Sequence, residues 1–212
     1  MNKVLVLVII VCSLAAGQVM ADRLILTPTG RTLTTGGLKG EYAASSDLDG
    51  SKIYWANIGV SRLEIEGARF QGFGVEDTDA ISAQVSIIPE TSFTPAIALG
   101  VRDISDQTKG KGLLYDGQSI YLAASKSLPG PGGGVPFALQ DVKVHGGIGT
   151  GSLSGVFFGV EGKLPMGIEF MSEFDTKNFN YAASYKVGPA MSVRAASIHG
   201  DIFYGALFST AF

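Results

Sequence analysis

The chain has only one cysteine and two histidines among its 212 residues, so it is poor in the side chains that most often bind metal ions. Its net charge is −3, and it has no basic run of the kind that nucleic-acid binders carry. Charged residues make up 17% of the chain, below the ~25% that is typical of soluble domains. The composition therefore argues against a metal site and a nucleic-acid partner.

Catalytic constellations are also lacking. Ser197 lies two residues before His199, but no third partner or oxyanion signature accompanies this pair. The glycine-rich stretch 130–134 is not followed by the Lys-Ser/Thr pair and helix of a phosphate-binding loop. We therefore predict that the protein is not an enzyme and uses no cofactor or metal.

The N-terminus has the order of a secretory signal. Lys3 supplies the positive charge, residues 4–14 form an apolar run, and Val19-Met20-Ala21 precede Asp22 as the expected cleavage site. The apolar run is shorter than the ~20 residues of a membrane-spanning helix. We expect cleavage after Ala21, which removes Cys12 and leaves a mature chain without disulfide or thiol chemistry.

Most of the mature chain alternates between apolar and polar residues. In the segment 62–66, for example, Arg62, Glu64 and Glu66 alternate with leucine and isoleucine. Successive strand side chains point to opposite faces, so this period predicts β-strands, whereas no segment has a sustained helical period. The expected strands cover residues 38–45, 52–60, 61–70, 79–88, 95–103, 117–127, 141–149, 154–164, 166–174, 178–187, 190–198 and 201–212.

The length and simple order of these strands predict an all-β, antiparallel, up-and-down transmembrane β-barrel of about 12 strands (10–14). Residues 1–21 are then the signal peptide, 22–37 a periplasmic lead-in and 38–212 the barrel. A soluble sandwich would show the same alternation, with the charges on its solvated face. In the barrel, the lumen-facing candidates are Arg62, Glu64, Glu66, Arg102, Lys143, Glu161, Lys163, Glu169, Glu173 and Arg194, and the lipid-facing ones Leu63, Ile65, Ile81, Val85, Val156, Phe158, Ile168 and Phe170.

The last strand favours the membrane interpretation. Tyr204, Phe208 and Phe212 share one face of it, and the chain ends on the aromatic Phe212. This pattern resembles the C-terminal assembly signal of bacterial outer-membrane barrels, although Thr210 is polar. Because both termini of such a barrel are periplasmic, residues 103–116 should form an external loop and 128–140 an unusually long periplasmic one.

Several stretches in the same order resemble the YjbH-type family of outer-membrane proteins linked to exopolysaccharide production. These are residues 26–31 (LTPTGR), where Gly30 replaces an alanine, then 100–104 (GVRDI), 121–126 (YLAASK), 155–161 (GVFFGVE) and 173–175 (EFD). The family's chains are much longer, whereas this chain holds one barrel.

The resemblance implies a bacterial outer-membrane protein that takes part in export or assembly of extracellular polysaccharide. Its expected partners are outer-membrane lipid, the barrel-assembly machinery, and polysaccharide or periplasmic export proteins. A small porin-like channel is one alternative, although the mixed inward charges favour a lumen crossed by ion pairs over a porin's separated acidic and basic walls. A structural or surface-anchoring barrel without transport is the other.

Overall fold

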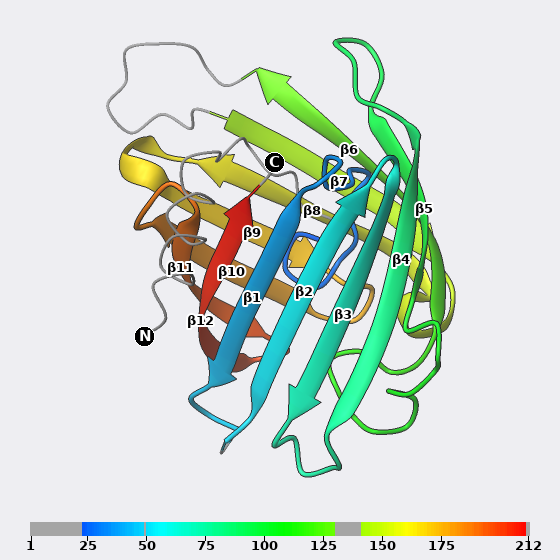
Figure 1. Ribbon diagram of the computed structural model, residues 1–212, viewed down its shortest axis with the longest axis vertical. Helices are drawn as coiled ribbons and strands as arrows, with labels where there is room; N and C mark the ends of the chain where they lie inside the picture. The colour runs from blue at the N-terminus through cyan, green and yellow to red at the C-terminus, as the bar shows by residue number, and fades with distance from the viewer. Residues whose placement is uncertain (1–22, 49, 130–140, 211–212) are drawn as a thin grey trace.

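The computed structural model describes residues 23–48, 50–129 and 141–210, and these residues form one closed β-barrel (Figure 1). Each strand pairs antiparallel with the next along the chain, and β1 pairs with β12 to close the barrel. The strands are β1 Leu38–Ser45, β2 Lys52–Val60, β3 Leu63–Gln71, β4 Thr78–Ile88, β5 Ala96–Arg102, β6 Ser119–Pro129, β7 Asp141–Gly149, β8 Gly155–Lys163, β9 Ile168–Phe174, β10 Phe179–Lys186, β11 Met191–Ile198 and β12 Asp201–Thr210. The predicted all-β architecture with twelve antiparallel strands is confirmed.

Two single-turn 3-10 helices, Gly151–Leu153 and Pro165–Gly167, interrupt the connections. In the described part of the chain, no helix is long and apolar enough to cross a membrane. The expected cleavage site after Ala21, most of the loop 128–140 and the terminal Phe212 lie outside the described residues.

The alternation in the sequence places apolar side chains on the outside of the barrel and most charged strand residues on the inside. In β3, Leu63 and Ile65 are each 39% exposed, whereas Glu64 and Glu66 are 1% and 5% exposed. A soluble sandwich would place these carboxylates on its solvated face. Their burial, together with the closed ring of strands, excludes that alternative for this chain.

Each barrel end is defined here by the strand ends that meet there. The terminal end is where β1 begins and β12 ends, and the loop end is where β5 ends and β6 begins. Residues 103–116, which we expect to form an external loop, lie in the β5–β6 connection at the loop end. This connection turns partly inward, because its apolar residues Leu113 and Tyr115 are buried in the core of the barrel.

The segment that precedes β1 also lies inside the barrel (Figure 1). Residues 23–33, which we call the plug, were predicted to belong to a periplasmic lead-in. Arg23 through Arg31 and Leu33 are all buried, and Arg23 and Pro28 form an isolated bridge that folds the segment on itself. The sequence did not predict this burial, which is possible because the polar inner wall offers the segment the hydrogen-bond partners that it needs.

Candidate functional site

The plug is held to the barrel wall chiefly by one carboxylate, Glu173 on β9. Its oxygens accept hydrogen bonds from the backbone N–H groups of Ile25 (2.9 Å), Leu26 (2.8 Å) and Thr27 (3.0 Å), and from the Thr27 hydroxyl (2.9 Å). Asn180 on β10 donates a further bond to the same carboxylate at 2.9 Å. An ionised carboxylate has about four acceptor sites, so Glu173 satisfies three consecutive amides that have no strand partner.

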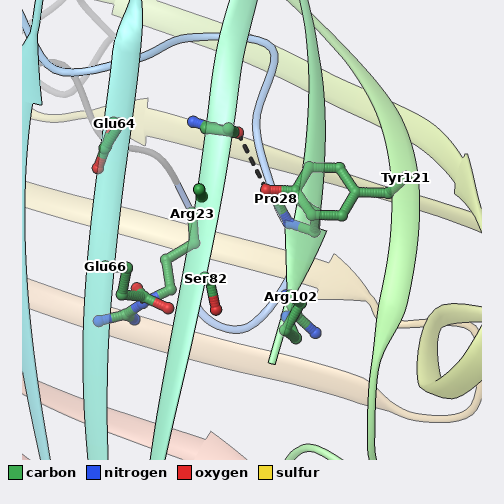
Figure 2. Close-up of a pocket in the computed structure, with 9 residues that line it drawn as sticks. Arg23, Pro28, Glu64, Glu66, Ser82, Arg102 and Tyr121 are labelled. Carbon is green, nitrogen blue, oxygen red and sulfur yellow. Dashed lines mark hydrogen bonds and ion pairs between the residues drawn. The ribbon is translucent and has the colours of Figure 1, made fainter. Parts of the chain in front are cut away.

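Arg23 fixes the start of the plug. Its guanidinium donates to Glu66 on β3, to Glu41 on β1 and to the carbonyl of Ile25, each at 2.9 Å. It also lies over the indole of Trp55, 3.9 Å from the ring centroid. Figure 2 shows Arg23 beside Glu66, with Glu64 and Arg102 on the surrounding wall. A buried ion requires such complete pairing, because its desolvation is unfavourable.

The rest of the plug is bonded to wall side chains on several strands. Glu64 accepts the Leu33 N–H at 2.7 Å, and Arg102 donates to the Leu26 carbonyl. Ser125 on β6 accepts the Gly30 N–H at 2.7 Å, and Gln84 on β4 donates to the Arg31 carbonyl at 2.7 Å. Polar residues from β1, β3, β4, β5, β6 and β9 therefore converge on one segment.

An apolar core fills the lumen on the loop-end side of these bonds. It joins plug residues Ile25 and Leu26 to side chains from eight strands and to Tyr115 of the inward-turned loop. The Tyr115 hydroxyl accepts a hydrogen bond from the Trp55 indole at 3.1 Å, and its ring packs edge-on against Phe70 with centroids 5.3 Å apart. Burial, with a smaller contribution from the negative charge of Glu66, raises the pKa of this hydroxyl.

The structure brings most of the predicted lumen-facing residues to the inner wall. Arg62 differs: it is exposed in the turn between β2 and β3, where Ser61 has a φ of 58°. The chain reverses at this turn, so the alternation of β3 starts one residue later, at Leu63. The other predicted residues are buried or partly buried: Glu64, Glu66, Arg102, Lys143, Glu161, Lys163, Glu169, Glu173 and Arg194.

Ion pairs cross the inner wall at the terminal end, as the mixed charges of the sequence predicted. Lys143 on β7 pairs with Glu161 on β8. Lys163 lies 4.0 Å from Glu169, and Arg194 on β11 donates to Glu41 at 3.0 Å. Most of these charges are therefore neutralised by a neighbour.

A cavity of about 390 Å³ remains at the terminal end, between the plug and β7–β12. It contrasts with the apolar core at the loop end. Seven cationic residues and two carboxylates line it: Arg23, Arg31, Lys39, Lys143, Lys163, Lys186 and Arg194, with Glu161 and Glu169.

His199 contacts the turn that joins β9 and β10. Its Nε2 lies 2.6 Å from Asp175, which also accepts a hydrogen bond from Asn180 at 3.0 Å. Burial alone would raise the pKa of Asp175, but these hydrogen bonds and those from two backbone amides lower it below its usual range. Ser197, in contrast, lines a hollow in the outer face together with Tyr181 and Tyr204.

Sequence reasoning missed the plug as a structural element, and with it Arg23 and Thr27. Part of the plug, the stretch LTPTGR, was noted in the sequence only because it resembles the YjbH-type family. No model of a known protein family matches this chain, and no curated protein matches it significantly. The lumen and its plug are therefore interpreted from their geometry.

Proposed function

We propose that this protein is a bacterial outer-membrane barrel with a closed lumen, and that it takes part in the assembly of extracellular polysaccharide without forming an open channel. The observation that carries the membrane location is the apolar outer face. Ile81, Val156 and Tyr204, for example, are 53%, 60% and 58% exposed. In water such a surface would be unfavourable, since each large apolar side chain contributes ~1.5–3 kcal/mol when it is removed from water.

The charges on the outer face support the same location. Arg69 and Asp79 face each other in register on β3 and β4, near the loop end, where a membrane interface would lie. Closure of the sheet pairs β1 with β12, so the ring has no free strand edge, which is the condition for spanning a lipid bilayer with strands. Tyr204 lies on the outer face of β12, and Phe208 is partly buried on the same strand. Both fit the proposed recognition by the barrel-assembly machinery.

The filled lumen favours a barrel without an open channel over the porin alternative. A porin keeps a water-filled passage. Here the plug, the inward-turned loop and side chains from eight strands pack together at one level of the barrel. Exported polysaccharide would therefore have to pass elsewhere, and the proposed role is accessory: anchoring, organising or binding.

The polysaccharide part of the proposal rests on the YjbH-type resemblance alone. The first resembling stretch lies in the plug, and residues of three others, Arg102, Ser125 and Glu173, bond to it. Thr27 and Arg31 belong to it, Arg102 donates to its Leu26 carbonyl, and Glu173 accepts its amides. These separated stretches therefore describe one arrangement, a short segment bonded inside a barrel.

Two measurements test the proposal separately. Fractionation of the source bacterium should place the protein in the outer membrane, with heat-modifiable migration on gels; recovery in the soluble fraction would refute the location. Deletion of the gene should reduce extracellular polysaccharide, and the intact gene should restore it. Unchanged polysaccharide in the deletion strain would refute the biological role and leave the membrane location intact.

A further inference from the structure

The cavity at the terminal end has the features of a ligand-binding site. Its volume of about 390 Å³ lies within the ~300–1,000 Å³ of typical small-molecule sites. Four carboxylates that do not line the cavity pair with cations that do; these are Glu41, Glu66, Glu90 and Asp141. Together with the two lining carboxylates these make six negative charges, one fewer than the seven positive charges that line the cavity.

Arg194 is the decisive residue, because one edge of its guanidinium lacks a good acceptor. Nη1 donates to Glu41 at 3.0 Å, but the contact of Nη2 is the Met171 sulfur at 3.5 Å, and Nε has no partner among the described residues. Thioether sulfur is a weak acceptor. Nε and Nη2 form the side-on fork that binds the two oxygens of a carboxylate or phosphate. Both Arg194 and Met171 line the cavity.

Two further residues of the same cavity carry buried nitrogens without a partner in the described part of the chain. These atoms are Nε of Arg31 and Nε2 of His145, whose residues are 6% and 7% exposed. Ser125 accepts the Gly30 N–H, and its oxygen lies 2.7 Å from His145 Nδ1. In the tautomer in which Ser125 donates to Nδ1, the proton of the ring is on Nε2, and all three unpartnered nitrogens are then donors.

From this arrangement we infer that the cavity binds a small molecule through its oxyanion group, a carboxylate or a phosphate, with the Nε/Nη2 edge of Arg194 as the principal contact. An ionised carboxylate supplies only acceptors, and a phosphate group supplies several. Met171 moves aside to admit it, which a flexible thioether side chain permits. Lys186, which also lines the cavity and is exposed, adds positive charge at its mouth.

The inference is tested by calorimetric titration of the full-length protein, purified in detergent, with glucuronate, inorganic phosphate and glucose as probes. Saturable binding of glucuronate or phosphate, and none of glucose, is expected. Whichever oxyanion binds more tightly identifies the preferred group. Equal binding of glucose, or no saturable heat with either anion, would overturn the inference.

Variants assign the binding to the fork. Arg194→Gln and Arg194→Lys should each weaken binding about tenfold or more, because the first removes the charge and the second keeps the charge but removes the fork. Arg69→Gln, an identical change on the outer face, should bind as the wild type does. Met171→Leu removes the sulfur contact at a similar side-chain volume and should still bind. Unaltered affinity in Arg194→Lys would refute the fork, and heat-modifiable migration of each variant verifies its folding.

Discussion

Thr27 and Glu173 lie 146 positions apart in the chain, yet both the backbone N–H and the hydroxyl of Thr27 donate to the same oxygen of Glu173, at 3.0 and 2.9 Å. This relationship joins the segment before the barrel to its ninth strand. It explains why a carboxylate that is 1% exposed is retained inside the barrel. A buried charge without such donors would be strongly destabilising.

Replacement of Glu173 by glutamine should release the plug. The side-chain amide keeps the size but has one oxygen, and its NH2 group would face the N–H donors of residues 25–27. We expect the free energy of unfolding to fall by about 2–3 kcal/mol and hydrogen exchange of these amides to accelerate. Glu76→Gln, in the exposed β3–β4 turn, is the matched control. Unchanged exchange at residues 25–27 would show that Glu173 does not hold the plug.

Gly30→Ala should also destabilise the packed plug. A Cβ at Gly30 would overlap the backbone carbonyl oxygen of Ala96, whereas a Cβ at Gly67 would meet nothing within 4 Å. We expect a loss of about 1–3 kcal/mol for Gly30→Ala and little change for Gly67→Ala, measured by urea unfolding in detergent. Equal effects of the two substitutions would contradict the close approach of the plug to β5 and β6.

The hydrogen bond between His199 and Asp175 should make stability sensitive to acid. The pKa of Asp175 is lowered in the folded protein, so its contribution is complete above the unfolded value of ~3.9 and is lost as the pH falls toward the folded value. Asp175→Asn should therefore flatten the acid side of the stability profile, measured by urea unfolding at decreasing pH. If the stability of the variant falls equally steeply at low pH, the acid sensitivity belongs to other carboxylates.

The proposed membrane location predicts a depth-dependent effect of charge on the outer face. Ile81 lies within β4, whereas Val60 ends β2, and they are similarly exposed at 53% and 51%. In lipid, Ile81→Arg should lower the free energy of unfolding by ~2–4 kcal/mol, whereas Val60→Arg should lower it by only ~0–1 kcal/mol. Similar losses at both positions would argue against a bilayer around the barrel.

The strands were predictable and the plug was not, for a physical reason. The alternation in β3 and β4 is a local property of the sequence. It therefore predicted these strands to within a few residues of their ends, together with the side chains that face the lumen. The entry of residues 23–33 into the lumen depends on Glu173, Glu64 and Ser125, which are far away in sequence. Arg62 was predicted to face the lumen but is exposed, because the turn between β2 and β3 interrupts the alternation.

The LTPTGR stretch lies in the plug, but neither the family resemblance nor the periodicity of the sequence predicted its entry into the lumen. It departs from the family pattern at Gly30, and there the structure has no room for the side chain of alanine. The departure therefore lies at a close contact between the plug and the wall. The assignment of Arg31 to the plug, next to Ser127 and Glu90, could be made only from the three-dimensional arrangement.

The central claim, a membrane barrel whose lumen is closed by its own N-terminal segment, is tested most directly by single-channel recording in a planar lipid bilayer. The intact protein should insert and remain electrically silent, because the plug and the apolar core around Tyr115 fill the lumen. A variant that lacks residues 23–33 should show larger and more frequent openings. Steady, voltage-independent conductance of the intact protein, unchanged by removal of the plug, would contradict the account.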